Sequence, residues 1–221
     1  TTLFRSVNGF RDDEIDNFFR YWLKAKFADS RKSGQRFDSD YHREMFKSDL
    51  NEILTLDHNS SQVKLFLKGP FRYFTDLYSR LWEATQEDHA SFRSVYFNSL
   101  NELDTQFMLI LSACKVDDPE EEIKIRAVSE GLDRMFALLQ LQGAYDSNEF
   151  ASRLFVVSAE IREKPATDIP TIFEKHLIAE LIERRGVQVN QAFSYTLFRP
   201  MSIDRLNTRF TRYFFGRVET L

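Results

Sequence analysis

Large apolar side chains recur at spacings of three and four residues along most of the chain, and this spacing constrains the fold most. Within residues 71–82, for example, Phe71, Phe74 and Tyr78 fall on one helical face. No segment alternates apolar and polar residues as a half-buried strand would. Only 7 Gly and 5 Pro interrupt the chain, whereas 22 Phe and 8 Tyr supply large packing side chains. The sequence therefore predicts an all-α fold of about ten helices, an orthogonal array or bundle with no sheet.

Capping residues and helix breakers predict where the N-terminal helices begin and end. Acidic residues at 12–14 suit the start of a helix that ends near Ala28. The polar segment 29–40 is expected to be a flexible loop, because it contains Gly34 and few apolar residues. A second helix is predicted over residues 41–54. Its inward side chains are expected to be Phe46, Leu50, Ile53 and Leu54.

Later signals of the same kind divide the rest of the chain. Gly69-Pro70 is expected to end a short helix before the apolar stripe of residues 71–82. The segment VDDPEEE (residues 116–122) predicts a helix start, and so does the capping sequence that begins at Asp146. Gly143 and Gly186 are expected to end the helices that precede them. A final helix is predicted from Ser202 onward.

Domain organisation is predicted from chain length and the proline positions. A chain of 221 residues fits one large domain or two small ones. Pro165 and Pro170 bracket a linker, which favours a main helical domain over residues 1–165 and a C-terminal helical subdomain over 166–221. The subdomain is expected to lead to a further domain downstream. One continuous domain is the alternative.

Arginines concentrate toward the C-terminal end. The chain as a whole has a net charge of −4, which argues against a protein that binds nucleic acid through overall positive charge. Residues 184–217 nevertheless contain one acid, Asp204, and have a local charge of +6, so the remainder sums to −10. The seven arginines of this segment are Arg184, Arg185, Arg199, Arg205, Arg209, Arg212 and Arg217. They are therefore the candidate residues for contact with DNA or with a neighbouring domain.

On the last predicted helix the arginines are not all on the same side. Arg205, Arg209 and Arg212 are spaced by four and three residues and are expected to form a basic ridge opposite the apolar side. Such a ridge suits phosphates or an acidic partner surface, and the alternative is an ordinary solvated face. Arg217 projects onto the apolar side. It should either extend to water along its aliphatic stem or pair with a carboxylate across an interface.

Recognisable catalytic and nucleotide-binding motifs are absent from the sequence. It contains no G-x-x-x-x-G-K-[ST], G-x-G-x-x-G, G-x-S-x-G, H-E-x-x-H or paired C-x-x-C. Cys114 is the single cysteine and cannot form an internal disulfide, which favours a reducing, cytoplasmic compartment. A buried structural thiol is favoured over a nucleophile, because no His lies at a fixed spacing from it. No catalytic residue and no cofactor are therefore expected in this segment.

Two groups of side chains resemble metal ligands only by spacing. His176, Glu180 and Glu183 lie at i, i+4 and i+7 and could ligate a metal, but a solvated charged face is the favoured interpretation. The other histidines, His42, His58 and His89, fall in separate segments. The acids of VDDPEEE are explained by the helix macrodipole without a cation. No metal site is therefore expected.

Targeting and membrane signals are absent as well. The start TTLFRSVNG has neither a basic n-region nor an apolar run of signal-peptide length. No stretch approaches the 18 to 20 apolar residues of a membrane span, roughly the thickness of a bilayer. The first residue is Thr rather than Met, and we expect a processed chain or a fragment of a longer protein.

Five stretches occur in the same order as in one known family. They are FFRYWLKAKFADSRKSG (18–34), FDSDYHREMF (37–46), VYFNSLNELDTQFMLILSACKVDD (95–118), LLQLQGAYDSNEF (138–150) and TRFTRYFFGRVETL (208–221). Together they resemble the helical central region of GmrSD-type bacterial proteins, which are type IV, modification-dependent restriction and antiphage endonucleases. The resemblance spans nearly the whole chain and consists mostly of packing motifs.

The resemblance implies a scaffold rather than a catalytic centre. In that family an N-terminal ParB/sulfiredoxin-like domain carries an Asp-Gly-Gln-Gln-Arg motif associated with nucleotide use, and a C-terminal HNH nuclease supplies a metal-binding His site. Gly34-Gln35-Arg36 lacks the Asp and the second Gln of that motif, and no His follows His176. The positions that match the family, with an expected structural role, are Trp22, Tyr145, Asp146, Asn148, Tyr213, Phe214 and Arg217.

The function expected from the resemblance is a non-catalytic helical scaffold between a nucleotide-dependent sensor domain and an HNH nuclease. Its partners would be the flanking domains of the same protein, with no membrane partner, and the parent would be an HNH endonuclease with nucleoside triphosphate dependence. One alternative is a DNA-binding module that contacts phosphates through the C-terminal arginines. A second alternative is a free-standing helical adaptor that binds other proteins.

Overall fold

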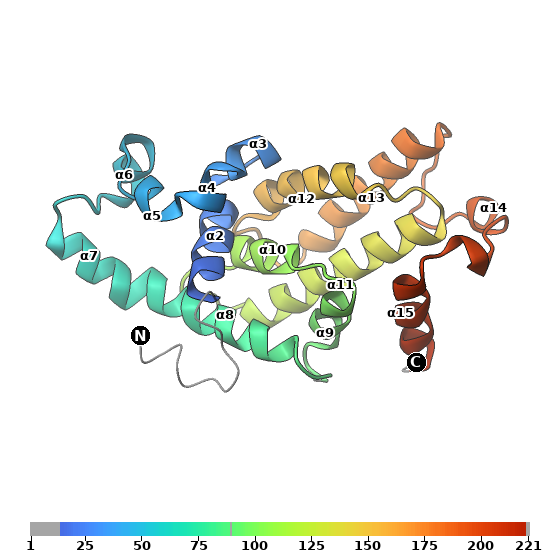
Figure 1. Ribbon diagram of the computed structural model, residues 1–221, viewed down its shortest axis with the longest axis horizontal. Coiled ribbons are helices and arrows are strands. Elements are labelled where there is room, and N and C mark those ends of the chain that lie inside the picture. The colour runs from blue at the N-terminus through green and yellow to red at the C-terminus, as the bar shows by residue number, and fades with distance from the viewer. Residues whose placement is uncertain (1–13, 89, 220–221) are drawn as a thin grey trace.

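The computed structural model describes residues 14–88 and 90–219, and all of its regular elements are helical. No strand occurs in these two ranges, so the expected all-α fold is confirmed. Figure 1 shows the helices in chain order. Their bounds are α2 (Glu14–Phe27), α3 (Arg31–Gly34), α4 (Arg36–Ser39), α5 (Tyr41–Glu44), α6 (Ser48–Leu54), α7 (Ser60–Phe66), α8 (Arg72–Ala84), α9 (Arg93–Leu100), α10 (Thr105–Ala113), α11 (Glu121–Leu141), α12 (Ser147–Ile161), α13 (Ile169–Arg185), α14 (Tyr195–Phe198) and α15 (Thr208–Glu219).

Helix α10 lies at the centre of the fold. Its sequence TQFMLILSA contains no charged residue, and every residue from Gln106 to Ala113 is buried. An all-round apolar helix can be stable only when other elements cover every side of it. Helices α2, α8, α11 and α12 pack against α10 (Figure 1). Burial of a Leu or Ile side chain such as Leu109 or Ile110 contributes about 1.5–3 kcal/mol.

Polar groups at the end of α10 are satisfied by lysines from two other segments. Lys124 donates from Nζ to the Ala113 carbonyl at 3.1 Å, and Lys26 donates to the Cys114 carbonyl at 2.8 Å. Asp118 in turn accepts from Lys124 at 2.7 Å and from two backbone N–H groups. Burial alone would raise the pKa of Asp118, but these hydrogen bonds hold it below its ordinary value. Asp118 thus has a specific structural role in addition to the expected macrodipole effect.

Helix α11 forms the second centre of packing, against α9, α10 and α13. It begins where VDDPEEE predicts and is followed by Gly143, whose φ of 62° is the left-handed conformation that ends many helices. Gly131 lets α13 approach closely: a Cβ added there would lie 2.6 Å from the Phe173 ring. The contact between α11 and α13 therefore depends on a glycine in the middle of a helix, despite its low helix propensity.

The expected helix end at Gly69-Pro70 is wrong. Helices α7 and α8 continue into one another through a π-helical turn, Leu67–Phe71, which contains both residues. Proline removes a backbone donor and clashes with the preceding turn of an α-helix. A wider π-helical turn can accommodate a proline at this position without ending the helix. The result is the long rod formed by α7 and α8 in Figure 1.

Two further expectations near the N-terminus are also wrong. Residues 29–40 form α3 and α4 instead of a loop, and Phe37 is fully buried. Ser30 caps α3 with a reciprocal capping box. The predicted helix 41–54 is broken between α5 and α6, and of its predicted inward residues Leu50 is buried whereas Phe46 and Ile53 are 49% and 67% exposed. The acidic residues 12 and 13 lie outside the described residues.

The C-terminal third begins with the expected caps. The Asp146 carboxylate accepts from the N–H groups of Asn148 and Glu149 at the start of α12. Helix α13 begins at Ile169 with Pro170, which was expected to close a linker, in its first turn, and Gly186 follows the helix with a φ of 63°. One hydrophobic cluster includes Leu132 from the first predicted domain and Phe173 and Phe210 from the second. The division at residues 165/166 stays a prediction.

Among residues 14–88 and 90–219, no helix has both the length and the apolar character that crossing a bilayer requires.

Candidate functional site

The structure distributes the seven candidate arginines over four elements. Arg184 and Arg185 end α13, Arg199 follows α14, Arg205 ends the 3-10 helix Ile203–Arg205, and Arg209, Arg212 and Arg217 lie in α15. The single helix expected from Ser202 is wrong, because α15 begins only at Thr208. Asn207 accepts from the Phe210 N–H at 2.8 Å, as an N-cap residue does. Arg205 therefore does not share a helical row with Arg209 and Arg212, and the predicted ridge does not form.

Three of the seven arginines are paired with acids inside the structure. Arg184 lies 3.4 Å from Glu180 and 3.7 Å from both Asp146 and Glu149. Arg209 lies 2.5 Å from Glu102, with both side chains exposed, so the pair contributes little stability. Arg217 forms a partly buried pair, described next.

Arg217 and Tyr213 hold α15 on α11 through one buried carboxylate. Asp133 in α11 is 4% exposed. Arg217 donates from Nη2 to Asp133 Oδ2 at 2.8 Å, and the Tyr213 hydroxyl donates to Oδ1. The guanidinium also lies 4.7 Å from the centre of the Phe97 ring in α9, a cation–π distance. Pairing with a carboxylate was one of the two outcomes expected for Arg217. The carboxylate belongs to the same domain, however, and not to a partner across an interface. We call Asp133, Tyr213 and Arg217 the α15 latch.

Burial sets the protonation behaviour of the α15 latch. It raises the pKa of Asp133, an effect that the hydrogen bonds from Tyr213 and Arg217 oppose, and it raises the pKa of the Tyr213 hydroxyl as well. A carboxylate in this position would be very costly without its two donors. Asp133 could not be identified from the sequence, because an acid inside a long amphipathic helix gives no local signal of a partner 84 residues away.

Four arginines remain without an ion-pair partner among the described acids: Arg185, Arg199, Arg205 and Arg212. Arg199, Arg205 and Arg212 are exposed. Beside Arg212 and Arg209 a groove runs between α9 and α15, and its apolar lining includes Phe97, Leu100 and Tyr213. Phe97 and Tyr213 are 4% and 5% exposed, so the groove offers cationic side chains that suit phosphates but no exposed ring on which a base could stack.

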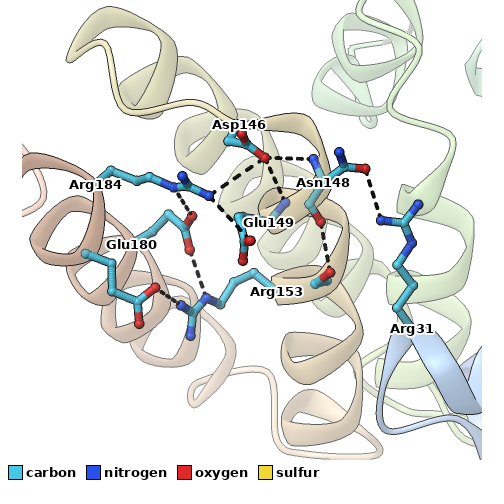
Figure 2. A network of polar contacts seen from close by, with 9 residues as sticks. Arg31, Asp146, Asn148, Glu149, Arg153, Glu180 and Arg184 are labelled. Carbon is cyan, nitrogen blue, oxygen red and sulfur yellow. Dashed lines mark hydrogen bonds and ion pairs between the residues drawn. The ribbon is translucent and has the colours of Figure 1, made fainter.

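The face that carries His176, Glu180 and Glu183 is not the solvated surface predicted for it. His176 and Glu180 are 4% and 2% exposed, and only Glu183 is exposed. Glu180 accepts hydrogen bonds from Arg153 at 3.0 Å and from Arg184 at 3.4 Å (Figure 2). Glu183 accepts from Arg153 at 2.6 Å. The network joins α12 to α13 and extends through Asp146 and Asn148 to Arg31 of α3, so these acids serve packing.

Neither of the two groups that resemble metal ligands by their spacing forms a metal-binding cluster in the described ranges. No group of three or more His, Cys, Asp or Glu side chains there is placed to hold a metal ion. Cys114 is buried as predicted, and burial raises its thiol pKa to about 12. A thiol with that pKa is protonated at neutral pH, which agrees with a structural role.

Comparison with protein-family models, curated proteins and solved structures gave no match to this chain. The resemblance to GmrSD-type proteins therefore stays a prediction.

The α15 latch predicts a large effect from a small substitution. Tyr213→Phe should lower the free energy of unfolding by about 1.5–3 kcal/mol, because it removes a hydrogen bond to a buried charged group. Urea denaturation followed by circular dichroism measures this change. Tyr195→Phe is the matched control, since Tyr195 is 68% exposed. Equal stability of the two variants would contradict the latch.

His176 predicts a pH dependence of stability near neutrality. Burial lowers its pKa below 6.5, although Glu160 at 3.2 Å opposes the shift. The unfolded chain therefore binds more protons at this site than the folded chain between the lowered pKa and 6.5. Stability should rise with pH through this window. In His176→Gln the rise should be smaller, as measured by urea denaturation at pH 5, 6 and 7, and an unchanged slope would contradict the assignment.

Proposed function

We propose that this chain is a non-catalytic helical scaffold domain of a GmrSD-like modification-dependent restriction or phage-defence protein. In that protein it would couple an N-terminal nucleotide-dependent sensor domain to a C-terminal HNH nuclease, in the cytoplasm. The proposal combines the sequence resemblance with one structural observation, the α15 latch.

The α15 latch supports a coupling role for a physical reason. Helix α11 packs against α9, α10 and α13, and α15 packs against α9 and bonds to α11 through Asp133. Displacement of α15 would remove both donors from the Asp133 carboxylate, so small displacements of α15 would be unfavourable and the helix would be either docked or released. A movement applied to α15 would then be transmitted to α11 and to the helices around it.

The purified chain tests the non-catalytic assignment directly. It should cleave neither modified nor unmodified DNA with Mg²⁺ or Mn²⁺ and nucleoside triphosphates, and it should not hydrolyse the nucleotide. Cleavage or turnover would overturn the assignment. The coding sequence that flanks this segment tests the family assignment. We expect it to encode a sensor domain before the segment and an HNH motif after it. A gene that encodes neither would contradict the proposal.

A second candidate function is DNA binding by the exposed surface of Arg199, Arg205 and Arg212. The observation that favours it is that these three side chains are exposed and have no acid at ion-pair distance in the described ranges. Arg212 also lines the groove between α9 and α15. The seven arginines of the segment do not act as one surface, since Arg184 and Arg217 already serve packing.

Salt dependence tests this second function. If the arginines contact phosphates, the logarithm of the association constant for duplex DNA should fall by about 0.9 per neutralised phosphate for each tenfold rise in salt concentration. Replacing Arg199, Arg205 and Arg212 by Gln should weaken DNA binding and lower that slope, measured by fluorescence anisotropy. A control with Arg43, Lys68 and Arg72 changed to Gln removes the same charge from other exposed positions. If both triple variants lost the same amount of DNA affinity, the attraction would be nonspecific. That result would refute a specific role for Arg199, Arg205 and Arg212.

A further inference from the structure

A polar pocket lies between the end of α9, the C-terminal half of α11 and the start of α15. Its volume is about 430 Å³, which is in the range of pockets that hold small organic molecules. The side chains that line it include Asn101 after α9, Phe136 and Gln140 on α11, Tyr145 before α12, and Thr208 and Arg209 on α15. Among the described residues of this lining, Arg209 alone is charged. We call this site the Asn101 pocket.

Asn101 contributes a buried acceptor without a partner. The residue is 7% exposed, and its Oδ1 atom is buried and accepts no hydrogen bond from a described residue. Its Nδ2 atom donates to the Phe97 carbonyl at 3.4 Å. Exchange of the two amide atoms would place two acceptors side by side, so the oxygen is the atom that lacks a partner. Folded proteins satisfy most buried polar groups, so this oxygen indicates a donor supplied by a bound molecule.

The Asn101 amide is held weakly enough to meet such a donor. Its bond to Phe97 is longer than the usual N–H···O distance of about 2.9–3.0 Å, and it is the one hydrogen bond that the side chain makes with a described residue. The terminal torsion of an asparagine side chain has a broad range of accessible angles. A rotation of the amide therefore gives up little and turns Oδ1 toward the pocket that the residue lines.

The first turn of α15 presents free donors to the same pocket. The Asn207 side chain accepts from the Phe210 N–H, and the Asn207 carbonyl accepts from Thr211. The N–H groups of Thr208 and Arg209 have no acceptor among the described residues. Free N–H groups and the positive end of the helix dipole together favour an anion at this position.

Arg209 adds a full positive charge beside these donors. Its pair with Glu102 joins two exposed side chains, and such pairs are weak and exchange readily for a better acceptor. The pair engages one guanidinium nitrogen, so further donors remain. One guanidinium and the partial charge of a helix N-terminus match a single negative charge, and the planar fork of arginine matches a carboxylate. A carboxylate therefore suits the pocket better than a phosphate dianion.

The remaining lining suits a short organic molecule rather than a bare ion. The rings of Phe136 and Tyr145 lie 5.2 Å apart, edge to face, and form an apolar wall. The side chains of Gln140 and Tyr145 make no hydrogen bond with a described residue, so their polar groups are available to a ligand. The pocket thus joins an anion-binding end to an acceptor, with apolar surface in the same lining.

We propose that the Asn101 pocket binds a small carboxylate that carries a neutral hydrogen-bond donor, such as a primary amide. The carboxylate bonds to the Arg209 guanidinium and to the N–H groups of Thr208 and Arg209. The donor of the ligand bonds to Asn101 Oδ1. The proposal is independent of the GmrSD-like assignment, because it rests only on the pocket.

Three probes of similar size test the two ends of the pocket separately. Succinamate has a carboxylate and an amide, monomethyl succinate has a carboxylate and no donor, and succinamide has the amide and no carboxylate. Succinamate should bind to the purified chain in a nuclear magnetic resonance titration. Each of the other two should bind about tenfold more weakly, because each lacks one of the two groups that the pocket recognises.

Two variants assign these effects to residues. Arg209→Gln should weaken succinamate binding by about tenfold and leave succinamide binding unchanged, since it removes the charge that holds the carboxylate. Asn101→Leu should abolish the preference for succinamate over monomethyl succinate. Arg212→Gln is the matched control: Arg212 is an exposed arginine of α15 outside the pocket lining, and this variant should bind succinamate as the unmodified chain does.

Three results would overturn the proposal. The first is that succinamate does not bind, and the second is that succinamate and monomethyl succinate bind equally to the unmodified chain. The third is unchanged succinamate affinity in Arg209→Gln, a variant expected to fold because the Arg209 side chain is 53% exposed. If circular dichroism shows that Asn101→Leu does not fold, the comparison of the probes on the unmodified chain still decides whether the donor is recognised.

Discussion

The burial of α10 on every side is the constraint on which the rest of the structure depends. A helix with no charged residue has no face for water, so α2, α8, α11 and α12 must surround it. Its terminal carbonyl groups then lie where water does not reach, and Lys26 and Lys124 supply the donors. Asp118 neutralises Lys124. The polar interior of the domain is thus a consequence of its apolar centre.

The same reasoning explains why so many charged side chains have structural partners. Asp133, Glu180 and Asp118 are all buried, and each receives a lysine or arginine from a different turn or helix. A buried charge without a partner would cost several kcal/mol, so the helices are positioned to bring donors to these acids. After these pairs form, four of the seven C-terminal arginines have no ion-pair partner among the described acids, so fewer charges remain for an external partner than the sequence suggests.

Helix α11 connects the features to which we assign function. It contributes Asp133 to the α15 latch and Gly131 to the close approach of α13. A displacement of α15 would therefore act through Asp133 on the helix that also packs against α9, α10 and α13.

Local signals in the sequence determined the helical class, the helix start at VDDPEEE, the cap at Asp146 and the ends at Gly143 and Gly186. These features depend on residues within one or two turns, so spacing and propensity are sufficient to predict them. Only the tertiary structure decided that Pro70 lies inside a helix, that Glu180 is buried and that Arg217 meets Asp133. Each of these depends on packing or on a partner distant in sequence, and a pattern read along the chain contains no information on which distant residue that partner is.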